Sequence, residues 1–177
     1  MLRGEKVLLR AREEADIAIL HADLHEDVQM RSRANSRPWR PYSSGLTTSP
    51  FSIAEPTDGY TPFTVVDLAG NEVAGDASLW GIDPHNRVAH LGTALRPSMR
   101  GRGLGTDVIR VLCHYGFVVL GMQRLQVDTL ADNASMIGSA QRVGFQVEGT
   151  LRRAAWVNGE FLDEVVMGLL AEQWRRA

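Results

Sequence analysis

The stretch LGTALRPSMRGRGLGT, which runs from Leu91 to Thr106, decides the fold of this chain of 177 residues. It is typical of an apolar strand, a proline turn and a glycine-rich loop that opens a helix, because apolar residues recur at helical spacing from Leu104 to Tyr115. Glycines at a helix N-terminus leave several backbone N–H groups uncovered, here beside arginines. The stretch therefore predicts a site for a diphosphate.

The glycine spacing excludes two other phosphate loops. A Walker loop needs Gly-x-x-x-x-Gly-Lys-Ser/Thr, and no lysine follows these glycines. A dinucleotide fingerprint needs Gly-x-Gly-x-x-Gly after the first strand of a βαβ unit, whereas Gly101-x-Gly103-x-Gly105 follows three expected antiparallel strands in mid-chain. Taken alone, the glycines leave an ordinary turn before a helix open as an alternative.

The wider context resembles the GNAT acetyltransferase superfamily, whose acyl-CoA loop reads Arg/Gln-x-x-Gly-x-Gly/Ala after a strand. The resemblance covers about Pro62 to Leu170 and is closest to the branch of ribosomal-protein N-terminal acetyltransferases. Five pieces carry it in order: NEVAG (71–75), AHLGTAL (89–95), RGRGLG (100–105), DNAS (132–135) and GFQVEG (144–149). It implies an α/β (α+β) fold: a single GNAT-type domain over residues 1–177, with a mixed, mostly antiparallel central sheet and helices on both faces.

Composition agrees with a single globular domain. Hydrophobic residues make up 44% of the chain, and the formal net charge is −2, which gives no general attraction to nucleic acid or membranes. The first residues carry charges where a signal peptide needs an apolar run, so we expect a cytoplasmic protein. Cys113 is the only cysteine, which excludes an internal disulfide, and we expect it to pack in the core. A homodimer is left open.

Hydrophobic periodicity gives the expected elements. The helices are 13–30, 104–119 and 133–143, and the strands are 6–10, 63–67, 73–80, 88–95, 125–130, 145–151 and 165–170. His21 and His25 lie one helical turn apart, but no third ligand accompanies them, so a solvated face is favoured over a metal pair. The segment Arg31–Pro62 is rich in proline, serine and aromatic residues, and we expect a long loop with at most short helical pieces. A wall of the acceptor site is favoured as its role, with a mobile surface linker as the alternative.

The resemblance implies acetyl-CoA as co-substrate and no metal. Backbone groups of Thr93, Ala94 and Leu95 are expected along the pantetheine arm, and the side chain of Asn133 is expected to contact it. For Asn133 a plain helix N-cap is the alternative. The diphosphate would lie among Arg100, Gly101, Arg102, Gly103, Leu104, Gly105 and Thr106.

Acetyl transfer to an amine needs a group that takes the amine's proton. Asp128 is the first candidate, by its position five residues before Asn133, with a salt bridge as the alternative. His90 is the second, since histidine exchanges protons near neutral pH, although a half-buried strand histidine is the more typical case. The branch often carries a serine as thiolate proton donor where this chain has Met136. Ser135 or Ser139, a water or a tyrosine could take this role instead, or the leaving thiolate needs no acid.

The sequence thus predicts an acetyl-CoA-dependent N-acetyltransferase that transfers acetyl directly to a primary amine, of either a protein N-terminus or a small molecule. The alternative is a non-catalytic acyl-CoA-binding or interaction module on the same fold. Met136, which cannot donate a proton, keeps this alternative open.

Overall fold

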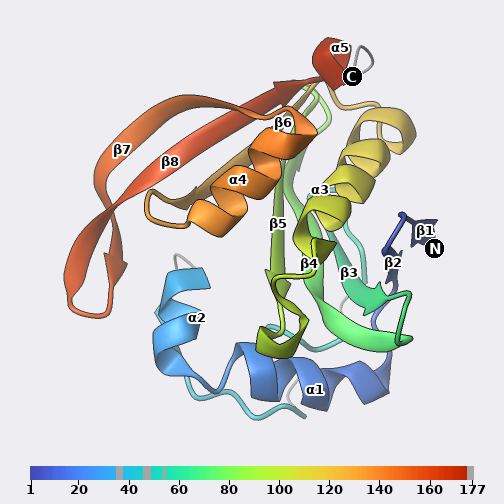
Figure 1. Cartoon of the computed structure of the whole chain (residues 1–177), viewed down its shortest axis with the longest axis vertical. Helices are drawn as coiled ribbons and strands as arrows, with labels where there is room; N and C mark the ends of the chain where they lie inside the picture. The colour runs from blue at the N-terminus through green and yellow to red at the C-terminus, as the bar shows by residue number, and fades with distance from the viewer. Residues whose placement is uncertain (35–37, 46–48, 54, 175–177) are drawn as a thin grey trace.

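One eight-stranded sheet organises the chain in the computed structural model, which describes residues 1–34, 38–45, 49–53 and 55–174. The strand order is β1-β2-β3-β4-β5-β6-β8-β7 (Figure 1). All neighbouring strands are antiparallel except β5 and β6, so the expected mixed, mostly antiparallel sheet is confirmed. The strands are β1 (Leu2–Arg3), β2 (Val7–Arg10), β3 (Tyr60–Asp67), β4 (Glu72–Asp83), β5 (Val88–Leu95), β6 (Arg124–Leu130), β7 (Gln146–Val157) and β8 (Glu160–Leu170).

Helices cover both faces of the sheet. They are α1 (Glu14–Leu24), α2 (Val28–Ala34), α3 (Leu104–His114), α4 (Ala134–Val143) and α5 (Ala171–Trp174), with a 3₁₀ turn at Pro97–Met99 and a π-helical turn, η2 (Tyr115–Val119), that continues α3. Apolar side chains of α3 and α4 pack with one sheet face into the main core, which includes Leu79, Leu91 and Leu112. On the other face, α1 forms a smaller core of Leu20, Leu24 and Phe51 against Val73 and Ala94.

The parallel pair β5–β6 opens the sheet. Its ladder covers only Val88–His90 opposite Arg124–Gln126, although β5 continues to Leu95 and β6 to Leu130. The two strands therefore diverge beyond His90, towards the C-terminal ends of both strands. Within the described residues no strand pairs with β5 on that side beyond His90, and Arg100 donates to the carbonyl of Leu95 at its end, so an extended group inserted there can pair with the β5 backbone.

The helix expected at 13–30 is two helices. Its first part ends at Leu24, because His25 leaves helical geometry with φ −121°. The side chain of Asp27 then accepts a hydrogen bond from the backbone N–H of Met30 at 3.0 Å, which caps the start of α2. The prediction of one continuous helix was wrong, and the short helix α2 occupies the beginning of the segment expected as a loop.

Four strands, β3, β4, β7 and β8, are longer than predicted. β3 already begins at Tyr60, whose neighbour across the ladder is Trp80. β7 and β8 form a long hairpin that turns at Asn158–Gly159 and extends beside α4 towards α2 (Figure 1). Asn158 at this tip donates a hydrogen bond to the carbonyl of Gln29 on α2 at 3.4 Å. No described helix is long and apolar enough to cross a membrane.

Candidate active site

The two residues predicted as alternative bases lie in contact. The imidazole Nδ1 of His90 on β5 lies 2.7 Å from the carboxylate Oδ2 of Asp128 on β6. Parallel pairing sets His90 opposite Gln126, and Asp128 follows on the same face of β6. The pair stands where β5 and β6 begin to diverge, and about a quarter of each side chain is exposed.

Hydrogen bonds keep Asp128 ionised. Burial acts to raise the pKa of this carboxyl group, but the hydrogen bonds from His90 and Gln126 outweigh burial, and the pKa lies below its ordinary value. Gln126 donates to Oδ1 at 2.9 Å. An ionised carboxylate can only accept hydrogen bonds, so the proton of the His90–Asp128 bond belongs to Nδ1. In the neutral imidazole, Nε2 is then the nitrogen that can take a proton.

Trp80 completes this part of the site, and the sequence analysis missed it. Its ring stacks on the imidazole of His90, with centroids 4.2 Å apart and planes inclined by 25°. The tryptophan is 43% exposed, so its other side is open to solvent. The alternation of residues along β4 does not reveal this role of Trp80. The role depends on the residue of β5 that lies opposite, and the strand register pairs Trp80 with His90.

Ser135 lies apart from this pair. It is exposed in the first turn of α4, and among the described residues no hydrogen bond joins it to His90 or Asp128. Met136 packs against the main core. Ser139 is buried and lies beside Gly105, at the diphosphate loop rather than at the His90–Asp128 pair.

The predicted diphosphate loop has the backbone that an anion requires. Gly101 and Gly103 adopt left-handed φ values of 73° and 78°, which turn successive N–H groups in one direction, and Gly103 is the N-cap of α3. No side chain caps this helix. A Cβ on Gly101 would meet nothing within 4 Å, so the space above the loop is open. The loop thus fits a diphosphate.

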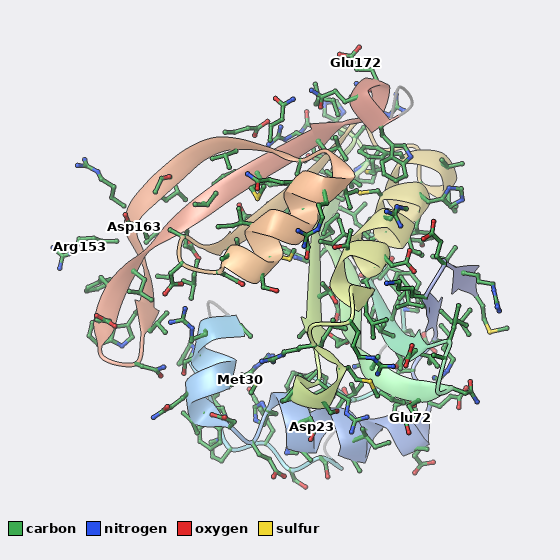
Figure 2. All side chains as sticks on the ribbon, in the orientation of Figure 1. Asp23, Met30, Glu72, Arg153, Asp163 and Glu172 are labelled. Atoms are coloured by element: carbon green, nitrogen blue, oxygen red, sulfur yellow. The ribbon has the colours of Figure 1, made fainter. Side chains whose placement is uncertain are left out.

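Charged side chains around the loop are partly engaged elsewhere. The guanidinium of Arg102 pairs with the buried Asp67 at 2.7 Å, and Arg100 donates to the carbonyl of Leu95 at 3.0 Å. Arg100 also reaches the sulfur of Met30 on α2, which lies on the side of α2 that faces this loop (Figure 2). Lys6 was not predicted here, but its Nζ donates to the carbonyl of Arg102 at 3.2 Å. The lysine therefore adds a cation to the loop.

The remaining cofactor candidates line the gap between β5 and β6. Thr93, Ala94 and Leu95 lie on β5 below the end of the parallel ladder. Asn133 is the N-cap of α4: its Oδ1 accepts from the N–H of Met136 at 3.2 Å, and its Nδ2 donates to Thr129 at 3.0 Å. The helix N-cap that was expected as the alternative role of Asn133 is therefore present, just after the C-terminal end of β6.

Two further expectations concern residues outside this site. Cys113 is fully buried in the main core, as predicted, and burial raises the pKa of its thiol. His21 and His25 were expected on a solvated face, which was wrong, because they are only 7% and 3% exposed. Trp39 and Tyr42 pack against the ring of His25, and His21 packs against His25. Among the described residues, no group of three or more metal-ligating side chains gathers.

Known proteins share this architecture. Spermidine N(1)-acetyltransferase of Escherichia coli (strain K12) is 27% identical over 177 residues, which cover 98% of this chain and 91% of that protein. YdaF of Bacillus subtilis (strain 168), whose assignment as a ribosomal N-acetyltransferase is provisional, is 31% identical over 60% of this chain and 58% of its own. The crystal structure of spermidine N-acetyltransferase from Vibrio cholerae with CoA and spermine superposes with a TM-score of 0.81 at 22% identity, covering 96% of this chain and 98% of that one.

Relatives of the polyamine and the ribosomal kind both match, so they support the superfamily rather than the ribosomal branch that the sequence resemblance favoured. The family described as acetyltransferase (GNAT) domain matches residues 6–146, which is most of the chain. The enzyme class predicted from the sequence, an N-acetyltransferase that uses acetyl-CoA, is confirmed. The chain therefore belongs to the GNAT acetyltransferase family.

Proposed function

We propose that this enzyme acetylates the primary amine of a small molecule, and that His90 and Asp128 together remove the amine's proton. The contact between His90 and Asp128 at the divergence of β5 and β6 carries the proposal. Relatives named as spermidine acetyltransferases support a small-molecule acceptor over a protein N-terminus.

Each residue of the site has a separate task in this proposal. The N–H groups of residues 101–106, with Arg100 and Lys6 nearby, hold the diphosphate, and the free edge of Thr93–Leu95 together with Asn133 holds the pantetheine arm. Acetyl-CoA bound in this way supplies the acetyl thioester at the divergence point. Holding both substrates there removes much of the entropic barrier, up to about 7–11 kcal/mol.

Proton removal falls to His90. Its Nε2 accepts the proton of the incoming amine, and the adjacent carboxylate of Asp128 stabilises the imidazolium that results. Trp80 holds the ring plane by stacking and excludes water from one side of it. Ser135 lies on the exposed first turn of α4, so we propose that water rather than Ser135 returns a proton to the leaving thiolate.

Turnover with a panel of amines tests the proposal. Free CoA thiol is followed with acetyl-CoA and either hexylamine, spermidine or a short peptide with a free N-terminus, and the product is identified by mass. We expect acetylated small amines and strong loss of their turnover in His90→Gln. Acetylation of the peptide alone would move the acceptor to protein N-termini.

The rival function is a non-catalytic acyl-CoA-binding module, for which Met136 remains the argument. Calorimetric binding of CoA without release of thiol from acetyl-CoA, across the whole amine panel, would establish that rival and refute the proposed enzyme.

A further inference from the structure

The segment that follows α1 in the sequence is strongly basic. Residues 28–54 contain four arginines, Arg31, Arg33, Arg37 and Arg40, and no aspartate or glutamate, although the whole chain has a net charge of −2. Arg37 lies outside the described residues. A polyamine acceptor would be repelled by such a segment, so the arrangement of its arginines bears on which amine the enzyme accepts.

Arg31 is the arginine of this segment that faces inward. Its guanidinium lies 5.6 Å from the ring centroid of Phe51, and burial lowers the pKa of Arg31 from its ordinary value. Among the described residues its guanidinium forms no hydrogen bond or ion pair. Arg33, two residues further along α2, instead pairs with Asp132 at 2.6 Å on a more exposed side. Partial burial without a partner is costly for a guanidinium, which indicates that its partner is a ligand.

The surroundings of Arg31 carry an excess of positive charge. Arg12 lies 5.6 Å from the same Phe51 ring and forms an ion pair with Asp76. The negative charge of Asp76 also acts to raise the pKa of Arg31, so the two guanidinium groups share one carboxylate. The Nε of Arg12 is buried and has no hydrogen-bond partner among the described residues. An anion at this position would compensate both arginines.

Tyr60 adds a donor to the same cluster. Burial and the charge of Asp76 raise the pKa of its phenol, which therefore remains protonated at neutral pH. A protonated phenol beside a guanidinium can donate a hydrogen bond to a carboxylate or a phosphate.

The cluster lies on the same sheet face as the His90–Asp128 pair. Tyr60 is opposite Trp80, and Trp80 is opposite His90, so the backbones of Tyr60 and His90 are two strands apart, or about 10 Å. Trp80 stands between them, with its indole next to Gly92 and 43% of the residue exposed, so an acceptor that reaches from His90 to Tyr60 would lie along this ring. An extended molecule with its amine at His90 can therefore place its other end beside Arg31.

We propose that the preferred acceptor is a small amine that also carries an anionic group, a carboxylate or a phosphate, several bonds from the nitrogen, and that Arg31 and Tyr60 bind this group. The inference rests on the proposed acetyl transfer and specifies its substrate class. It separates this enzyme from the relatives named for spermidine, whose acceptor is a polycation without an anionic end.

Acceptors of equal chain length test the inference. Hexylamine, ε-aminocaproate, aminohexyl phosphate and hexamethylenediamine differ only in the group at the far end, which is neutral, carboxylate, phosphate or cationic. We expect kcat/KM for one of the two anionic acceptors to exceed that for hexylamine by about tenfold, as one charge-assisted hydrogen bond implies, and hexamethylenediamine to fall below hexylamine. The better of the two anionic acceptors identifies the anion.

Substitutions in α2 test which residue causes the preference for an anionic acceptor. In Arg31→Gln the ratio of kcat/KM between the anionic acceptor and hexylamine should fall to near one, while Arg31→Lys, which keeps the charge, should retain part of it. Arg33→Gln, with the same charge change in the same helix, should leave the ratio as it is. The affinity for CoA, measured by calorimetry, should be equal in Arg31→Gln and the wild type.

Three results would overturn the inference. One is turnover of hexylamine with no gain from an anionic end, and another is a preference that survives Arg31→Gln. The third is a matching loss of CoA affinity in Arg31→Gln, which would assign Arg31 to the cofactor. Absence of turnover with every amine, by contrast, would remove the proposed acetyl transfer itself and this inference with it.

Discussion

Nδ1 of His90 lies 2.7 Å from Oδ2 of Asp128, although the two residues are 38 positions apart in the sequence. The sequence offered them as competing bases, whereas the register of the β5–β6 pair joins them. Two groups in direct contact act as one unit, so the effects of removing them should not add.

Replacement of the base should abolish most turnover. We expect His90→Ala to lower kcat by roughly 10²–10⁴, the usual contribution of a general base, and Asp128→Asn to cause a smaller loss. The double variant should be no slower than His90→Ala alone. Raising the pH should restore part of the activity, because the free amine then forms without help. Steady-state kinetics of the three variants measures this.

His114→Ala is the matched control, since this histidine is exposed at the end of α3. Near-normal activity of His90→Ala at neutral pH would exclude His90 as the base and leave Asp128 or water with that task.

The left-handed glycine at the start of α3 gives a prediction for cofactor binding. Gly103→Ala forces an alanine to φ 78°, which costs about 1–2 kcal/mol, and turns the N–H groups of the loop away from the diphosphate. We expect the affinity for CoA, measured by calorimetry, to fall at least tenfold. Gly121→Ala is the control with a similar φ of 67° in another turn, and it should bind CoA normally. Equal losses in both variants would reduce the effect to general instability.

Phe51 gives a prediction for stability. It is 2% exposed in the smaller core and lies beside the guanidinium groups of Arg12 and Arg31. Phe51→Ala should lower the free energy of unfolding by about 3–5 kcal/mol, as other buried phenylalanines do. Ile53→Ala, at a residue 57% exposed, should change it little. Urea denaturation compares the two, and a small effect of Phe51→Ala would show that the segment 49–53 does not contribute to the core.

Periodicity predicted the elements whose burial is one-sided or complete. Helix α3, strand β5 and the loop between them follow from apolar spacing, proline and glycine, because each of these acts within a few residues. The break between α1 and α2 escaped prediction, since it depends on the geometry of His25 and the cap by Asp27 within a run that remains periodic. The last six residues of β7, 152–157, escaped as well: Arg153 lies at φ 55° in an irregular stretch that extends away from the domain (Figure 2).

The part of the site that consists of backbone groups was predictable from the sequence. The part that depends on contacts between side chains of different strands was not. The diphosphate loop follows from its glycines. The contact of His90 with Asp128 and the stacking of Trp80 depend on strand register, which local patterns do not fix. The segment 31–62 was expected to present its aromatic residues to the acceptor, but Trp39 donates its N–H to the carbonyl of His25 and stacks on that ring. Trp39 therefore anchors the segment, and the acceptor contacts that we propose come from Arg31 and Tyr60.

Acid should weaken the fold through Asp16. This carboxylate is 2% exposed and accepts hydrogen bonds from Arg10 at 2.6 and 2.8 Å. Burial acts to raise the pKa of Asp16, but Arg10 and the backbone N–H of Glu13 outweigh burial, and the pKa lies below its ordinary value. The stabilisation is therefore complete above the unfolded pKa of about 3.9 and is lost as the pH falls through the folded value.

Thermal unfolding between about pH 5 and about pH 3 measures this contribution. The melting temperature of the wild type should fall more steeply with acid than that of Asp16→Asn, which has no proton to take up. Asp58→Asn, at an exposed turn, should follow the wild type. Parallel curves for all three proteins would assign the acid sensitivity to other groups.

Cys113 should have no part in transfer. An acetylated cysteine would require a thiolate that the acetyl group can reach, but Cys113 is fully buried on α3 in the main core, and burial raises the pKa of its thiol. Cys113→Ala should therefore keep most of its kcat, while the free energy of unfolding falls by about 1 kcal/mol for the loss of one buried group. Turnover measured well below the melting temperature separates these two effects. A folded Cys113→Ala variant without activity, or an acetyl thioester on Cys113 detected by mass spectrometry, would replace direct transfer with a two-step route.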